Sequence, residues 1–180
     1  MDGKMDAKKL ETFIDRQSVS FICSVDEENF PHVKAMLKPR KHVGIKEFYF
    51  STNTSSLRVR QYRENPNASI YFYHKGLIKY EGLLLVGKME VLTDQETKHA
   101  LWKKGDFIFY KKGETDPDYC VLKFTALKGR YYCNLKRKPL TNIFSGKRRR
   151  AGGNWREGPV GAARDAVLHR RGRNTAPAQH

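Results

Sequence analysis

Apolar and polar residues alternate in short segments along most of the first 145 residues, and the segments end at Gly, Pro, Asn or Asp. An alternation with a period of two, rich in β-branched and aromatic residues, is typical of half-buried β-strands. Gly82 and Gly87 interrupt the longest segment, where glycine marks a bulge, a barrel corner or a close approach to a ligand. The expected strands are residues 18–25, 30–37, 47–51, 68–73, 77–92, 119–126 and 129–134, with the last two forming a closing hairpin.

Three short helices are predicted between these strands. The first begins after Asp6, which can cap it, and the second covers residues 56–64. The third begins at a capping box formed by Thr93 and Glu96 and ends at Gly105. Six or seven strands joined by tight turns, with small helices between them, predict a mainly-β (α+β) fold built on a closed antiparallel barrel.

The charge of the chain divides it into two parts. Of the 180 residues, 35 are Lys or Arg and 19 are Asp or Glu, for a net charge of +16. The last 35 residues hold nine basic and two acidic residues, use Arg in place of Lys, and lose almost all apolar periodicity. We therefore predict a domain over residues 1–145 and a disordered basic tail over residues 146–180.

Two explanations of this tail remain open. It is either a basic arm that contacts nucleic acid, or sequence foreign to the domain, vector-derived or out-of-frame. We favour the second, because the composition changes abruptly and in every residue class at once.

Several classes of protein and site are excluded by the composition. No apolar stretch approaches the roughly 18 residues that a membrane span needs. The first residues lack the apolar region of a secretory signal, so we expect a soluble, cytoplasmic protein. Three widely spaced cysteines and scattered histidines argue against a disulfide framework or a metal site. Dinucleotide, P-loop and nucleophile-elbow motifs are absent from the sequence.

The most informative pattern is a basic extended run followed by hydroxyl side chains at the start of a helix. Lys34 lies in the run, Ser51 to Ser56 precede the helix, and Arg58 lies in its first turn. Free N–H groups, hydroxyls and cations together suit a phosphate group. The alternative is that Thr54 or Ser56 only caps the helix and that Arg58 is solvated, and a pattern of this kind, taken alone, more often has this simpler explanation.

Five segments in collinear order, two of which contain this pattern, favour the phosphate-binding interpretation. They are FPHVKAML (30–37), FYFSTNTSS (48–56), RENPNAS (63–69), GLLLVGKMEVL (82–92) and TDPDYCVLKF (115–124). Together they resemble the pyridoxamine 5'-phosphate oxidase-like family of FMN-binding split barrels, and most of all its short bacterial general stress protein branch. The resemblance spans roughly residues 8–135. It implies a split β-barrel, a homodimer, and FMN held in a groove at the subunit interface.

The resemblance also implies roles for individual residues. Lys34 matches a basic position that reaches the FMN phosphate or ribityl chain, and residues 35–37 match the strand whose backbone faces the flavin ring. Ser51 and Thr52 match a pair that meets the phosphate end.

Two positions depart from the family pattern. Two consecutive basic residues follow Ser56 in the family, whereas this chain has Leu57 and Arg58. Gly82 lies near a position where the oxidases place a glutamine that touches the ring. Weaker retention of FMN is the expected consequence. The predicted cofactor-binding residues are Lys34, Ala35, Met36, Leu37, Ser51, Thr52, Ser56, Leu57, Arg58 and Trp102.

An aromatic cluster after the third predicted helix allows two interpretations. Trp102, Phe107, Phe109 and Tyr110 could stack on a flavin or substrate, but such a cluster more often belongs to the core. No catalytic residue is assigned, because the C-terminal segment with which the true oxidases hold pyridoxal phosphate has no counterpart here.

The function expected from the sequence is that of an FMN-binding flavoprotein, an oxidoreductase acting on a small molecule. The alternative is a non-enzymatic protein, either a flavin binder or a basic nucleic-acid binder. Tyr71 and Tyr73 could offer bases a stacking platform, but the aromatic RNA-binding motif is absent, so nucleic acid is the weaker alternative.

Overall fold

The fold is described by a computed structural model that covers residues 6–134 and 136–140. The tail predicted at residues 146–180 lies outside these residues. None of the described helices is long and apolar enough to cross a membrane. The described elements are α1 (Ala7–Asp15), β1 (Val19–Val25), β2 (Pro31–Leu37), β3 (Lys41–Val43), β4 (Glu47–Asn53), α2 (Leu57–Glu64), β5 (Asn67–Lys75), β6 (Tyr80–Leu92), α3 (Gln95–Leu101), the 3-10 turns η1 (Lys104–Ile108) and η2 (Gly113–Thr115), β7 (Tyr119–Cys133) and β8 (Lys136–Pro139).

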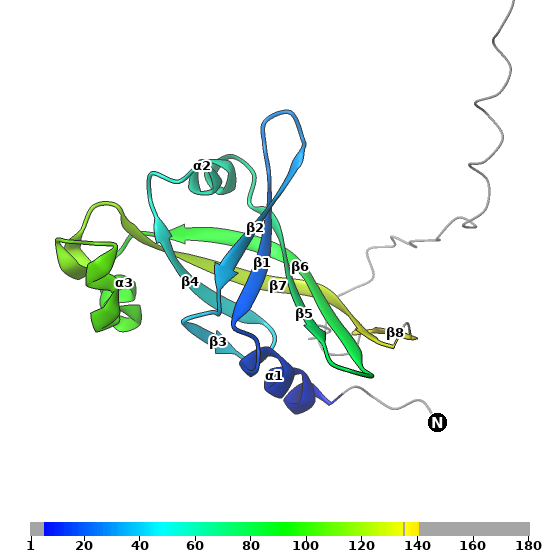
Figure 1. The fold of residues 1–180 in the computed structure, drawn as a ribbon. Helices are drawn as coiled ribbons and strands as arrows, with labels where there is room; N and C mark the ends of the chain where they lie inside the picture. Colours follow the sequence, from blue (N-terminus) through cyan, green and yellow to red (C-terminus); the bar gives the residue numbers. More distant parts are fainter. Residues whose placement is uncertain (1–5, 135, 141–180) are drawn as a thin grey trace, which may run out of the picture. The chain divides into compact units, whose positions relative to one another are not determined.

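The strands form one antiparallel sheet in the order β2-β1-β5-β6-β7-β4-β3, with β8 paired to β7. The sheet twists and wraps around an apolar core, and α1 and α2 lie at opposite ends of it (Figure 1). The core contains aromatic side chains from the middle strands, among them Phe48, Phe72 and Phe124, all fully buried. This architecture confirms the predicted mainly-β split barrel.

Helix α1 forms as the sequence predicted. The Asp6 carboxylate accepts a hydrogen bond from the backbone N–H of Lys8, and Leu10, Phe13 and Ile14 are buried against the core. A cap and a single apolar stripe are therefore sufficient to begin and orient this short helix.

The closing hairpin predicted from residues 119–134 is wrong. The segment is one strand, β7, which pairs with β4 over its first half and with β6 over most of its length. Gly129 does not turn the chain but lies opposite Leu85, where a β-carbon would press on that side chain and on the Leu84 carbonyl. Its role is close packing within the barrel.

The bulge expected at a glycine of the longest strand is confirmed. The register between β6 and β7 shifts between Val86 and Gly87, and a side chain at Gly87 would collide with the carbonyl oxygen of Thr125. Glycine is therefore required at Gly87, where the backbones of the paired strands β6 and β7 approach each other too closely for a side chain.

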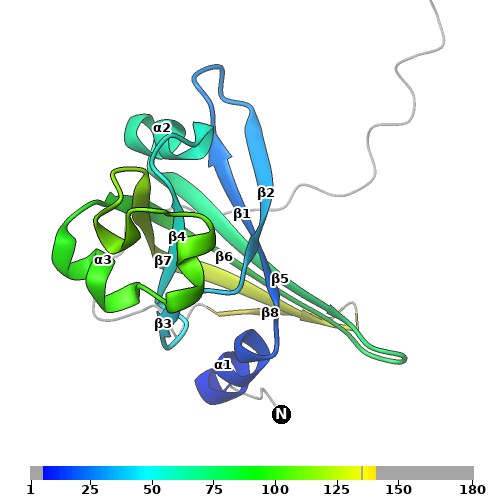
Figure 2. The same ribbon diagram turned by 60° about the vertical axis from the view of Figure 1, so that its left-hand side comes forward.

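The predicted boundaries of the third helix are also wrong. Asp94, not Thr93, caps α3, and its carboxylate accepts a hydrogen bond from the N–H of Thr97 at 2.8 Å. The helix ends at Leu101, well before Gly105, because the chain becomes extended at Trp102. The 3-10 turn η1 then carries the chain back toward the barrel, and α3 with the turns lies beside β4 and β7 (Figure 2).

His42 connects α1 to the short strand β3, which is not among the strands expected from the sequence. Its ring nitrogens lie 3.0 Å from Asp15 Oδ1 and 2.8 Å from the carbonyl oxygen of Gly44. Burial lowers the pKa of the imidazole, but the hydrogen bonds to Asp15 and Gly44 outweigh this effect and raise the pKa above its usual value.

The raised pKa of His42 predicts a pH-dependent contribution to stability. This contribution is complete below about pH 6.5, the pKa of an unfolded histidine, and is lost as the pH rises through the higher pKa of the folded state. We expect the loss to stay below about 1 kcal/mol, since Asp15 is exposed to solvent. Urea unfolding at several pH values should show the trend in the wild type and in His99→Gln, whose imidazole is mostly exposed. An unchanged trend in His42→Gln would refute the assignment.

Candidate functional site

A cleft of about 250 Å³ opens between the end of β2, strand β4 and the segment that follows α3. Backbone and side chains of three distant parts of the sequence meet there because β4 lies against the first half of β7, which the 3-10 turns precede directly. The cleft is lined by Ala35, Met36, Leu37, Lys38, Arg40, Phe50, Ser51, Thr52, Asn53, Arg58, Phe109 and Tyr110.

Six of the ten residues predicted to bind a cofactor line this cleft. They are Ala35, Met36, Leu37, Ser51, Thr52 and Arg58. The other four lie elsewhere: Lys34 is exposed on β2, Leu57 is exposed on α2, Ser56 is the N-cap of α2, and Trp102 packs edge-on against Tyr119.

Arg58, on α2, connects β2 and β4 in the wall of the cleft. Its Nη1 donates to Thr52 Oγ1 at 3.2 Å and contacts Met36 Sδ at 2.7 Å. Thus a cation from α2 is held between a hydroxyl of β4 and a thioether of β2. No described carboxylate pairs with it within 4.0 Å, so its positive charge remains available to a ligand.

The loop before α2 is shaped by Asp118, which precedes β7. Its carboxylate accepts from Asn53 Nδ2 and from the backbone N–H of Ser55, both at 2.8 Å, and its carbonyl accepts from the N–H of Thr54. These hydrogen bonds lower the pKa of the Asp118 carboxyl group, and the one from Asn53 has the largest effect. Asp118 therefore remains ionised and fixes the backbone of the loop.

Several donors at the start of α2 are left over by this network. Among the described residues, the N–H groups of Leu57 and Arg58 have no hydrogen-bond partner, as is normal in the first turn of a helix. The buried Ser56 Oγ also lacks a partner, although Ser56 stands at the N-cap. A buried hydroxyl without a partner costs about 1–3 kcal/mol, which a bound acceptor would recover.

The first turn of α2 also favours an anion electrostatically. It contains no acidic residue, so the positive end of the helix dipole is not neutralised there. Arg58 adds a full positive charge to the same turn. The interpretation of Ser56 as a simple cap is wrong in one respect, since its side chain makes no capping bond.

Two aromatic side chains form the wall opposite the strands. Phe109 is largely exposed, whereas Tyr110 is buried and lies 4.8 Å from Tyr119, ring centre to ring centre. Burial raises the pKa of the Tyr110 phenol and of the Tyr119 phenol, so each remains a neutral hydrogen-bond donor. Tyr119 Oη lies 3.4 Å from Ser51 Oγ.

Sequence reasoning missed part of the cleft lining. The aromatic cluster had been noted, and Phe109 and Tyr110 could have been assigned from it. Phe50 and Asn53 lie within the segment 48–56 that carries the resemblance, next to the predicted Ser51 and Thr52. Lys38 and Arg40 carried no signal of their own, because only the folded chain brings them to the cleft.

These features define the class of protein before any comparison. The chain is a split barrel whose cleft is lined by apolar residues of β2, by the aromatic rings of Phe109 and Tyr110, and by Thr52 and Arg58. Such a cleft suits a planar heterocycle that carries a phosphate.

Comparison with known proteins agrees with this class. The model of the family described as pyridoxamine 5'-phosphate oxidase matches residues 7–133, and the chain belongs to this family. No curated protein matches the chain.

Solved structures give the same result. A Clostridium acetobutylicum protein related to general stress protein 26 of B. subtilis is 36% identical over 75% of this chain and 95% of its own, with a TM-score of 0.66. General stress protein 26 of Bacillus anthracis shares the fold at 19% identity, over 74% of this chain and 98% of its own, with a TM-score of 0.59. A heme binding protein of Mycobacterium smegmatis shares the fold at 13% identity, over 74% of this chain and 56% of its own, with a TM-score of 0.60.

Proposed function

We propose that the protein binds FMN in the cleft and uses it to oxidise or reduce a small molecule. The observation that carries this proposal is the contact of Arg58 with Thr52 in the lining of a cleft whose other walls are apolar and aromatic, with the unpartnered donors of Ser56 and Leu57 adjacent to Arg58 in the chain. Family membership supports the same cofactor.

The residues present fit the parts of FMN. Arg58, the hydroxyls of Thr52 and Ser56, and the free N–H groups of α2 would hold the phosphate. The run Ala35 to Leu37 would line the flavin ring, because backbone groups and small apolar side chains suit a planar heterocycle. Leu57 leaves this end with one cation fewer than the family pattern.

When bound, FMN supplies the capacity to accept or donate a hydride or single electrons. The chain's own residues bind and orient the cofactor and limit the access of water. Phe109 and Tyr110 narrow the cleft from the side of η1, and the neutral phenol of Tyr110 can donate a hydrogen bond.

The relative that binds heme makes heme the second ligand to consider. Heme iron is held by an axial His, Cys, Met or Tyr. The lining of the cleft includes no His or Cys, and its Met36 is already in contact with Arg58. Its Tyr110 is buried, and burial raises the pKa of the phenol, which disfavours the phenolate that would bind iron. The donor set therefore favours a phosphate-bearing flavin over heme.

We also propose that the protein is a homodimer, formed through the outer face of β1, β2 and β5. The side chains of Val19 and Phe21 point away from the core, as do those of their partners Leu37 and Ala35 on β2. Strand β2 is an edge strand and is almost entirely exposed. A large apolar face beside an open edge is typical of a subunit interface. The outer face consists of Val19, Phe21, Val33, Ala35, Leu37 and Tyr73.

The outer face and the cleft share Ala35 and Leu37. A second copy docked on β2 would therefore close the cleft along one side. This arrangement agrees with a cofactor bound between two subunits.

Turnover of the flavin distinguishes an enzyme from a flavin store. The full-length protein is loaded with FMN, freed of excess by gel filtration, and mixed with NADH without oxygen. We expect the visible flavin band to bleach, and to return when an electron acceptor is added. Retention of FMN without bleaching by NADH would indicate a non-enzymatic flavin binder, and failure to retain FMN would refute the proposal.

Asp118→Ala should weaken FMN binding although Asp118 does not line the cleft. Removing the carboxylate frees Asn53 and the N–H of Ser55, so the loop before α2 loses its fixed shape. We expect the FMN dissociation constant to rise about tenfold, the equivalent of one charge-assisted hydrogen bond. Hydrogen exchange at Ser55 should accelerate in the same variant. Glu96→Ala, which removes an exposed carboxylate from the first turn of α3, is the control; equal effects would contradict this role.

A further inference from the structure

The turn that joins β5 to β6 carries two large apolar side chains that pack against nothing in the barrel. The two strands stay paired out to Lys75 and Tyr80, so the hairpin is regular up to its turn. Within the turn, Leu77 is fully exposed and Ile78 is 87% exposed. Residues 75–80 form the hairpin tip, which extends beyond the barrel (Figure 2).

Neither turn chemistry nor core packing explains this apolar pair. Tight turns between antiparallel strands are rich in Gly, Asn, Asp and Ser, and large apolar residues are not needed there. Single exposed apolar residues are normal on a protein surface, whereas Leu77 and Ile78 are adjacent and stand at the end of a projecting hairpin. The pair is therefore available to a partner.

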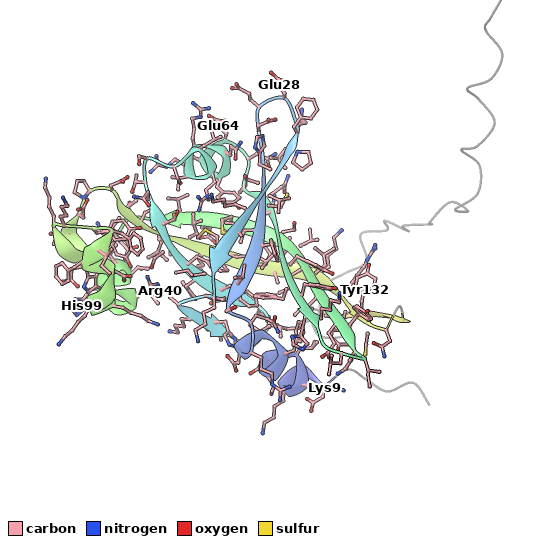
Figure 3. All side chains as sticks on the ribbon, in the orientation of Figure 1. Lys9, Glu28, Arg40, Glu64, His99 and Tyr132 are labelled. Carbon is pink, nitrogen blue, oxygen red and sulfur yellow. The ribbon has the colours of Figure 1, made fainter. Side chains whose placement is uncertain are left out.

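Cations flank the apolar pair on the hairpin itself. Lys75 precedes it, is exposed, and forms no ion pair with any residue that the structure describes. Lys79 follows it and pairs with Glu81 at 2.7 Å. Lys9 of α1, labelled in Figure 3, lines a hollow together with Lys79. Because Glu81 is the one acidic residue of the segment 74–81 and is paired, the hairpin tip keeps a positive charge.

The end of β7 brings further positive charge to the same end of the sheet. The N–H of Asn134 donates to the carbonyl oxygen of Tyr80 at 3.0 Å, so the end of β7 lies beside the hairpin tip. Strand β8, which pairs with β7 there, has the sequence Lys136-Arg137-Lys138-Pro139. Residues 132–139 contain these three basic residues and no acidic one. The partner of the hairpin tip is therefore expected to be negatively charged.

The order of residues along the hairpin matches the order of environments at a membrane surface. The apolar pair at the end suits the acyl chains. Tyr80, just behind the pair and half-exposed, suits the headgroup level, where tyrosine is enriched in membrane proteins. The lysines beside the pair can remain in water close to anionic headgroups, which attract basic segments.

The shape of the hairpin tip favours a lipid surface over a protein partner. A stable protein interface buries about 800 Å² on each partner, in complementary surfaces. Two side chains on a convex turn offer far less than this area. A lipid surface needs no complementary pocket, and apolar side chains bind it by entering the boundary between headgroups and acyl chains.

We propose that the hairpin tip docks the protein reversibly on a membrane surface that contains anionic lipids. Leu77 and Ile78 enter the lipid, and Lys75 and Lys79 lie at the headgroups. The inference does not depend on the proposed flavin function, because none of these four residues lines the cleft. Failure of one therefore leaves the other standing.

The test is a flotation assay of the full-length protein with vesicles of phosphatidylcholine and phosphatidylglycerol in equal parts, at about 0.15 M salt. We expect the protein to float with these vesicles and to stay behind with vesicles of phosphatidylcholine alone. Leu77→Ser/Ile78→Ser should lower the partition coefficient by at least about 30-fold, since two apolar side chains no longer leave water. This double variant keeps every charge of the chain, so electrostatic attraction is equal in it and in the wild type.

Ile108→Ser/Leu127→Ser is the matched control. It removes two exposed apolar side chains from other elements, η1 and β7, and should leave the partition coefficient unchanged. Lys75→Gln should lower the coefficient about fivefold, the effect of one cation near an anionic surface.

Two results of the flotation assay would overturn the inference. One is absence of flotation with the anionic vesicles, and the other is a loss in Leu77→Ser/Ile78→Ser no larger than in the control, which would assign the binding to charge alone. Analytical ultracentrifugation without vesicles adds a third criterion. A lower mass of the Leu77→Ser/Ile78→Ser assembly would place the hairpin tip against a second copy and overturn the inference, whereas an unchanged mass together with lost flotation supports it.

Discussion

Arg58→Ala should raise the dissociation constant for FMN by between about 10-fold and 100-fold. The substitution removes a cation that no described carboxylate neutralises, and with it a charge-assisted hydrogen bond of about 1.5–3 kcal/mol. Because about 1.4 kcal/mol corresponds to a factor of ten, the affinity falls by one to two orders of magnitude. Quenching of flavin fluorescence in an equilibrium titration measures the change.

Arg60→Ala is the matched control for this variant. Arg60 lies on the same helix, is exposed, and does not line the cleft. Its removal changes the net charge of the protein by the same amount, so any general electrostatic effect is equal in both variants. Equal loss of affinity in the two variants would mean that the phosphate lies elsewhere.

Phe21→Asp should convert the proposed dimer to a monomer and weaken FMN binding at the same time. Phe21 lies at the centre of the outer face, opposite Ala35 on β2 and Tyr71 on β5. In a two-fold symmetric interface each subunit contributes the same residue, so the interface would contain two new carboxylates. Like charges that face each other across an interface cost several kcal/mol. We expect the dimer dissociation constant to rise by more than about 100-fold. Analytical ultracentrifugation and the FMN titration provide the two readouts.

Val43→Asp is the control for the dimer prediction. Val43 is a half-exposed apolar residue on β3, at the opposite edge of the sheet. The Val43→Asp substitution should leave both the molecular mass of the assembly in solution and the affinity for FMN unchanged. A wild-type protein that is monomeric at high micromolar concentration, or a Phe21→Asp variant that still dimerises, would refute the proposed interface.

The fold could be predicted from the sequence where residues close together in the chain determine an element, as in α1 and most of the strands. Alternation and turn residues located most of the strands, and Asp6 with Leu10, Phe13 and Ile14 was sufficient for α1. The prediction failed at β7, because Gly129 resembles a turn residue in sequence. Whether a glycine turns the chain or makes room for a neighbour depends on the partner strand, and Leu85 was not visible from the local sequence.

The site could be predicted only in part for a related reason. Ser51, Thr52 and Arg58 belong to one continuous segment, so the helix start and the resemblance identified them together. Asp118 and Arg40 act through contacts with residues more than 60 positions away in the sequence. No local pattern indicates such a contact. Trp102 packs edge-on against Tyr119 and does not line the cleft, so its contact with a cofactor stays a prediction.

The central claim, that the cleft binds FMN, is tested most directly by titrating the wild-type, full-length protein with FMN. Flavin absorption and fluorescence report the bound fraction. The structure predicts saturation at one FMN per chain with a dissociation constant of about 10 µM or lower, an affinity within reach of the donors at α2. No change in the flavin spectrum at a protein concentration of about 100 µM, well above that constant, would contradict the claim.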